Sequence, residues 1–176
     1  MKYTEAISLI KDDYIRYKSF GGGNFLNLYY HERGFRYTVW LRLAAISGIF
    51  GILPKVVLHH LSSKLGIQIH SCTQIGGGLY IGHGIGIVVH PKTIIGKNVT
   101  LSQFLSIGSN SGKPAVIGDS VYIGPNVCLV ENVIIGSHSC IGAGAVVTKD
   151  IPAYSVAVGV PAKVIKQNNQ VNNENN

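Results

Sequence analysis

The fold is decided by a repetitive stretch that reads IHSCTQIGGGLYIGHGIGIVVHPKTIIGKNVTLSQFLSI over residues 69–107 and continues to Val147. An aliphatic residue recurs at every sixth position, and a glycine follows most of these residues. The aliphatic positions are Ile69, Ile75, Ile81, Ile87, Ile95, Leu101, Ile107, Ile117, Ile123, Leu129, Ile135, Ile141 and Val147. The register slips by two residues between Ile87 and Ile95 and by four between Ile107 and Ile117.

A period of six residues predicts a parallel β-helix. Three hexapeptides form one triangular turn, with a short strand on each face and the aliphatic residues pointing inward. Glycine suits the corners, where a Cβ is often unfavourable. Successive turns lie about 4.8 Å apart, and each turn buries its inner face only by stacking on the next. We therefore expect a β-helix of about four turns over residues 67–166.

Residues 1–66 carry helical rather than hexapeptide patterns. Helices are expected over residues 1–18, 24–30, 33–50 and 54–65. We expect this region to cover the open end of the β-helix, because the first turn would otherwise expose strand backbone. The apolar run at residues 39–53 is too short to span a membrane. An alternative is a peripheral membrane contact, in which basic side chains face lipid phosphates. The candidates are Arg33, Arg36, Arg42 and Lys55.

The composition restricts the partners. The net charge of +7 suits a polyanionic ligand, but no dense run of Lys and Arg with interleaved aromatics suggests nucleic acid. The three cysteines, Cys72, Cys128 and Cys140, lack zinc-like spacing, so we interpret them as reduced filler in a cytoplasmic protein. Met1 to Ile10 does not resemble a secretory signal. Residues 167–176 are almost entirely Asn and Gln, which predicts a disordered tail.

Few side chains in the repeat can do chemistry. The only carboxylates between Gly66 and Lys149 are Asp119 and Glu131, and they are too far apart in sequence to suggest an acid–base pair. His83 is the strongest candidate. It follows Ile81 by two positions, which places it at a corner with its side chain outside the prism. The glycines on both sides would leave it open to a substrate.

Three segments resemble the hexapeptide-repeat acyltransferases, and most closely the serine O-acetyltransferase branch. They are Ile81–Val89, which resembles the active-site stretch, Ile141–Pro152, which resembles the last full turn, and Gly159–Ile165, which resembles the exit segment. The resemblance implies a left-handed β-helix that forms a homotrimer, with acetyl-CoA bound in a groove between neighbouring chains. It implies an enzyme that needs no metal and transfers acetyl from acetyl-CoA to a hydroxyl.

The same resemblance implies roles for individual residues. His83 would be the general base, because an imidazole exchanges protons near neutral pH and an alcohol needs help to attack a thioester. Residues expected to contact the CoA arm are Pro125, Ala143 and Thr148. Lys163 and Lys166 match basic positions near the CoA phosphates.

The chain departs from the serine branch at the positions that would grip an amino acid. Gly82 and Gln68 stand where that branch has aspartates. The loop from Gly108 to Val116 has no Arg or His and offers only Lys113. We therefore expect a neutral sugar acceptor, in a precursor of a capsular polysaccharide, exopolysaccharide or lipopolysaccharide, with His90 and Lys113 as acceptor contacts. The alternative is L-serine.

Two further classes remain open at this point. Left-handed β-helices also include zinc carbonic anhydrases, and His70, His83 and His90 lie in adjacent repeats, although their spacing does not match that metal site. A non-catalytic scaffold would bind no acetyl-CoA.

Overall fold

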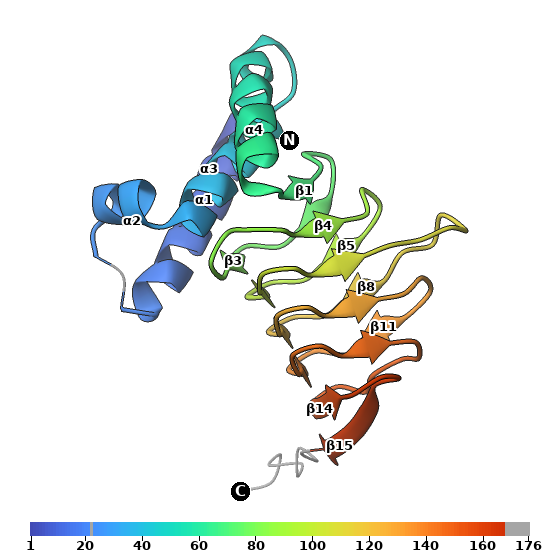
Figure 1. The fold of residues 1–176 in the computed structure, drawn as a ribbon. Coiled ribbons are helices and arrows are strands. Elements are labelled where there is room, and N and C mark those ends of the chain that lie inside the picture. The colour runs from blue at the N-terminus through green and yellow to red at the C-terminus, as the bar shows by residue number, and fades with distance from the viewer. Residues whose placement is uncertain (22, 168–176) are drawn as a thin grey trace, which may run out of the picture.

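The computed structural model describes residues 1–21 and 23–167 of the chain. Helices come first, and short strands follow in stacked coils (Figure 1). The helices are α1 (Tyr3–Ser19), α2 (Phe25–His31), α3 (Arg33–Ala44), the 3₁₀ helix η1 (Ile49–Gly51) and α4 (Ile52–Leu65). Apart from Gln167, the predicted tail at residues 167–176 lies outside the described residues.

The strands form three parallel faces of one solenoid. Face 1 contains β1 (Gln68–Ile69), β4 (Val88–Val89), β7 (Ser106–Ile107), β10 (Cys128–Leu129) and β13 (Val146–Val147). Face 2 contains β2 (Gln74–Ile75), β5 (Ile94–Ile95), β8 (Val116–Ile117) and β11 (Ile134–Ile135). Face 3 contains β3 (Tyr80–Ile81), β6 (Thr100–Leu101), β9 (Tyr122–Ile123), β12 (Cys140–Ile141), β14 (Ser155–Val158) and, antiparallel to β14, β15 (Lys163–Gln167). The predicted parallel β-solenoid of about four turns, with a helical region before it, is confirmed.

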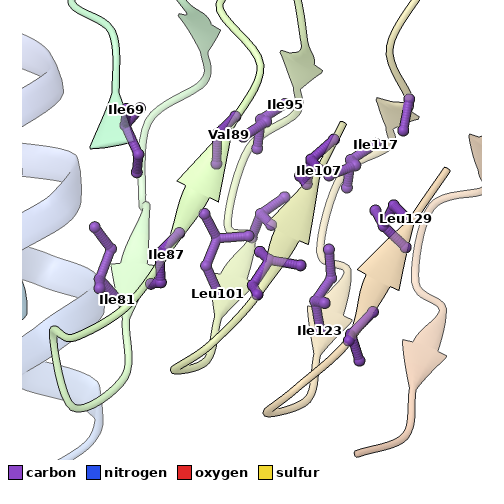
Figure 2. Packing of buried hydrophobic residues seen from close by; sticks show 14 of the residues in the cluster. Ile69, Ile81, Ile87, Val89, Ile95, Leu101, Ile107, Ile117, Ile123 and Leu129 are labelled. Atoms are coloured by element: carbon purple, nitrogen blue, oxygen red, sulfur yellow. The ribbon is translucent and has the colours of Figure 1, made fainter. Parts of the chain in front are cut away.

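The hexapeptide aliphatics build the core. In most of the two-residue strands the first side chain is exposed and the second is buried, as strand geometry requires. The buried side chains point into the prism and stack from coil to coil (Figure 2). Ile81, Leu101 and Ile123 form one such column on face 3.

The predicted position of the two-residue slip is wrong. Gln68 pairs with Val88 and Ile69 with Val89, so Val89 rather than Ile87 occupies the inward strand position of the second coil. The extra residues therefore lie at positions 82–87, before β4 and not after it. This corner absorbs them because His83 and two of its glycines adopt left-handed backbone conformations. Ile87 is still fully buried beside the strand. The longer insertion does lie between β7 and β8, as predicted.

The helical region agrees with the predicted elements except in α3. Asn24 caps α2 by accepting a hydrogen bond from the Asn27 amide (2.9 Å), and Gly66 ends α4 in the left-handed conformation (φ 64°). The helix expected over residues 33–50 ends at Ala44 instead. Gly48 has a φ of 79°, which a right-handed helix cannot contain, and a separate 3₁₀ turn follows it.

Three side chains from α1 and α3 satisfy the open edge of the first coil, one on each face. On face 1, Tyr37 accepts a hydrogen bond from the Ile69 amide (3.4 Å). On face 2, Arg42 donates to the carbonyls of Ile75 and Gly76 (2.7 Å each). On face 3, the Tyr17 hydroxyl accepts from the Ile81 amide (2.9 Å) and donates to the Ile81 carbonyl (3.1 Å). An exposed strand edge is thereby covered.

Arg42 is also part of a buried ion pair that fixes α1 to α3. Its guanidinium donates to both carboxylate oxygens of Asp13 (3.0 and 3.1 Å), and the Leu79 amide donates to the same carboxylate (2.8 Å). Burial raises the pKa of Asp13, and the guanidinium opposes that rise. Because Arg42 is 3% exposed, it cannot face lipid phosphates as the membrane alternative required. Among the described residues, no helix is both long and apolar enough to cross a bilayer.

The three cysteines do not fill the core. Cys72 and Cys128 are exposed and Cys140 is half-buried, and all three thiols are free. Cys128 and Cys140 occupy the first, outward position of their strands, so they do not point into the solenoid interior.

Candidate active site

His83 lies at the corner that joins face 3 to face 1 in the first coil. Its φ is 61°, and the following glycines Gly84 and Gly86 have φ values of 55° and 65°. Among the described residues, seven other non-glycine residues also have a positive φ, including Phe104 and Asn126, so this conformation belongs to the corners of the solenoid and is not specific to His83. Its side chain is exposed, as the sequence predicted. A Cβ on Gly84 would lie 2.7 Å from the Gly34 amide nitrogen, so the corner is held against the start of α3.

His83 opens into a pocket of about 580 Å³ between the solenoid and the helices. Solenoid residues form one wall and helical residues the other. The solenoid wall consists of Tyr80, Gly82, His83, Thr100, Ser102, Gln103, Ser120, Val121, Tyr122 and Pro125, and the helical wall of Arg16, Phe20 and Glu32. Tyr80 packs against Phe20 with a ring-centroid distance of 4.5 Å, which closes one side. The pocket is large enough for a small metabolite and has charges of both signs in its wall.

Two of the residues predicted to contact CoA follow the His83 corner down the solenoid. Pro125 and Ala143 lie between face 3 and face 1 in successive lower coils, at what we call the 3–1 edge: residues 82–87, 102–105, 124–127 and 142–145. The Gly144 amide donates to the Pro125 carbonyl (2.8 Å), which joins the last two coils of this edge. Pro125 shares the pocket with His83.

The other predicted site residues lie elsewhere on the same protomer. His90, Lys113 and Thr148 follow strands of face 1, so they lie at the 1–2 edge, where face 1 turns into face 2. Neither His90 nor Lys113 is among the described residues that line the His83 pocket. Lys163 and Lys166 are exposed on β15.

A larger cleft of about 1170 Å³ lies between the helices and the first coil. It contains His59, His70 and Cys72, and the Nδ1 atom of His70 lies 2.9 Å from the Cys72 Sγ. His83 is not among its lining residues in the described chain. The smaller pocket is the better candidate, because it brings His83 together with Pro125, a second residue expected at the site.

The histidine positions give the zinc alternative no support. His70 and His90 lie at the 1–2 edge, whereas His83 lies at the 3–1 edge. Within residues 1–21 and 23–167, no three His, Cys, Asp or Glu side chains come close enough together to hold a metal ion.

The sequence analysis missed the helical wall. Arg16 belongs to α1 and Glu32 joins α2 to α3, and both reach the pocket only because the helices fold back onto β3. Burial and the negative charge of Glu32 raise the pKa of Tyr80 in the opposite wall. No local motif marks these two residues, since a single charged side chain on a helix is usually solvated.

The strand topology defines a parallel β-solenoid of the hexapeptide type, and comparisons with known proteins point to the same class. The family model "Bacterial transferase hexapeptide (six repeats)" matches residues 114–149. A serine acetyltransferase of Staphylococcus xylosus is 37% identical over 122 residues, which cover 64% of this chain and 56% of the relative. The hexapeptide repeat and this similarity support the hexapeptide-repeat acyltransferase superfamily. The chain spans about half the length of the curated relatives it matches.

Solved structures support the same relationship over more of the chain. Soybean serine acetyltransferase apoenzyme superposes with a TM-score of 0.81 at 25% identity, covering 91% of this chain and 69% of that chain. The Neisseria gonorrhoeae serine acetyltransferase in complex with serine has a TM-score of 0.78 at 27% identity, covering 93% and 70%. These matches include the helices as well as the solenoid.

These relatives contradict the expected sugar acceptor. They are serine acetyltransferases, so the assignment to capsule, exopolysaccharide or lipopolysaccharide precursors is wrong. That expectation depended on the lack of charged groups near Gly82 and in the loop from Gly108 to Val116. The structure shows where the inference failed, because Arg16 and Glu32 bring charge to the His83 pocket from the helices.

Proposed function

We propose that this protein is an acetyl-CoA-dependent serine O-acetyltransferase and that His83 is its general base. The observation that carries the proposal is the exposed imidazole of His83 in a pocket lined by charges of both signs. The serine acetyltransferases to which the chain is similar support serine as the acceptor, and one of them is described in complex with serine.

The chemistry requires a base and no enzyme nucleophile. His83 takes the proton from the serine hydroxyl while that oxygen attacks the thioester carbonyl of acetyl-CoA. The tetrahedral intermediate then collapses, the carbon–sulfur bond breaks, and the imidazolium returns the proton to the CoA sulfur. The products are O-acetylserine and CoA. Because the solvent-facing corner holds the ring outside the core, it can reach both substrates.

The 3–1 edge is the proposed track for acetyl-CoA. Its thioester would lie at the His83 pocket, and its arm would run along the coils that carry Pro125 and Ala143, which stack directly below. We propose that Thr148, Lys163 and Lys166 contact the distal part of the cofactor, where the exposed lysines would pair with phosphates. In one protomer Thr148 lies on a different edge from His83, so this track would need a neighbouring chain.

We propose that the chain forms a homotrimer, as hexapeptide-repeat acyltransferases typically do. Outward side chains on face 2 support self-association. Ile94, Val116 and Ile134 pair in register and are 44%, 37% and 55% exposed, which forms an apolar column on the outside of the solenoid. Such a column is costly in water and suits an interface between copies. Sedimentation equilibrium at a mass of one chain would contradict the trimer.

The test is a transfer assay with acetyl-CoA and L-serine, analysed by mass spectrometry for O-acetylserine. We expect saturable turnover that falls by on the order of 10²- to 10⁴-fold in His83→Ala. His60→Ala is the matched control, because His60 is exposed on α4 and lies outside the pocket. Undiminished activity in His83→Ala would remove His83 from the mechanism, and no turnover of serine would refute the proposed function.

A further inference from the structure

In the part of the chain that the structure describes, the solenoid wall of the His83 pocket lacks the charged side chains that a serine acceptor needs. Free serine carries an ammonium and a carboxylate, and both lose hydration when they enter a pocket, so each needs an opposite charge. In the described chain, the solenoid wall of the His83 pocket contains no Arg, Lys, Asp or Glu. The binding charges must come from another part of the molecule.

Arg16 supplies the positive charge from α1. Its neighbour Tyr17 fixes this turn of the helix by hydrogen bonding to both the amide and the carbonyl of Ile81, two residues before His83. The Arg16 guanidinium carbon lies 4.8 Å from the centre of the Phe20 ring, which limits its freedom. Its Nε atom is buried and has no hydrogen-bond partner among the described residues. The side chain as a whole is half-buried and lines the pocket, so the rest of the guanidinium is the part that can face a ligand.

Glu32 supplies the negative charge from the junction of α2 and α3. It occupies the N-cap position of α3, where Ser, Thr, Asp and Asn are the residues that usually cap the first amides of a helix. Its side chain makes no such bond. The carboxylate lines the pocket instead. Burial raises the pKa of Tyr80 in the opposite wall, and the negative charge of Glu32 adds to that rise.

The two charges do not neutralise each other. In residues 1–21 and 23–167, the one ion pair is that between Asp13 and Arg42, so Arg16 and Glu32 line the same pocket without pairing. Two opposite charges held apart around a pocket of this size match a zwitterion. A neutral sugar would leave both of them without a partner.

We propose that Arg16 and Glu32 form the acceptor subsite, in which Arg16 binds the α-carboxylate and Glu32 the α-ammonium. This assignment rests on the proposed function. It orients the serine hydroxyl toward His83 on the opposite wall. The helical region therefore determines the acceptor, and the enzyme selects amino acids in which both charged groups are free.

The experiment compares L-serine with two analogues that each lack one charge. L-Serinamide lacks the carboxylate, and 3-hydroxypropanoate lacks the ammonium. For Arg16→Met we expect kcat/KM for serine to fall on the order of 10- to 100-fold, while the value for serinamide stays within about threefold. For Glu32→Gln we expect the same loss for serine and little change for 3-hydroxypropanoate. Analogues that turn over too slowly are measured as competitive inhibitors.

Matched controls separate this role from a structural one. Lys18→Met removes a positive charge from the same helix and Glu5→Gln a carboxylate from its first turn, and neither residue lines the pocket. The KM for acetyl-CoA and the melting temperature should not change in any variant. Arg16→Lys should restore part of the activity lost in Arg16→Met.

The outcomes distinguish the two proposals. If the wild type acetylates serine but Arg16→Met and Glu32→Gln do so equally well, the subsite is refuted and the proposed function stands. If a charge variant lost as much activity with the analogue that lacks the matching charged group as with serine, the subsite would also be refuted. If the wild type does not acetylate serine, both proposals fail.

Discussion

The solenoid and the helical region are built by opposite means. In the solenoid each aliphatic residue repeats the environment of the one in the coil before it, so the contacts of Leu101 resemble those of Ile123. In the helical region the structure depends on individual hydrogen bonds between residues that are far apart in sequence. Examples are the bonds between Arg42 and Asp13 and between Ile81 and Tyr17. The contacts of the solenoid recur from coil to coil, whereas these contacts of the helical region each occur once.

The same division holds for the proposed site. In our proposal the solenoid provides the base, His83, at one of its corners. The helices provide Arg16 and Glu32, which we propose as the acceptor subsite.

The largest effect on stability is expected at the buried ion pair. Asp13→Asn leaves the Arg42 guanidinium buried without its counter-charge, which costs about 3–5 kcal/mol of the free energy of unfolding. Urea denaturation measures this cost. Asp12→Asn, an exposed neighbour on the same helix, is the control and should change stability by less than about 0.5 kcal/mol. Equal stability of Asp13→Asn and wild type would show that the helices do not depend on this pair.

A smaller and more local effect is expected at the two glycines that flank His83. Gly84→Ala should cost about 1–3 kcal/mol, because Gly84 has a φ of 55° and its added Cβ would meet the Gly34 amide. Gly82→Ala should stay within about 0.5 kcal/mol, since its nearest non-neighbouring atoms lie 3.8 Å away. Thermal denaturation of both variants, with turnover measured beside it, tests whether helix packing shapes the corner. Similar losses of stability in Gly84→Ala and Gly82→Ala would show that packing against α3 does not shape the corner.

The smallest effect concerns the insertion between β7 and β8. Glu131 accepts hydrogen bonds from the amides of Ser111 (2.6 Å) and Asn110 (2.8 Å) and from the Ser109 hydroxyl (3.1 Å), which lower its pKa from 4.5 to about 2. Because the folded pKa is lowered, the stabilisation is complete above pH 4.5 and is lost as the pH falls through about 2.

Hydrogen exchange measures this effect at the Ser111 and Asn110 amides. We expect their protection to decrease as the pH falls toward 2, and Glu131→Gln to lack protection throughout. The solenoid core should stay protected, so this loop would open alone. Unchanged protection in Glu131→Gln would show that backbone geometry, and not the carboxylate, orders the loop.

The sequence predicted the solenoid well and the helical contacts poorly, for physical reasons. The hexapeptide repeat places an aliphatic residue at the same inward position in coil after coil, so the burial of Ile69 or Ile141 follows from the periodicity. The slip was misplaced because Ile87 and Val89 are both apolar and both buried, and the pattern cannot choose between them. His83 was found because it lies within the repeat. Arg16 and Glu32 were missed because their approach to it depends on how α1 and α3 fold back.

Calorimetric titration of L-serine into His83→Ala, Arg16→Met and Glu32→Gln most directly tests whether base and acceptor subsite are separate. If they are, His83→Ala binds serine within about threefold of the wild-type affinity, while each charge variant binds at least about tenfold more weakly. Loss of serine binding in His83→Ala together with normal binding in Arg16→Met and Glu32→Gln would contradict the division of roles between solenoid and helices.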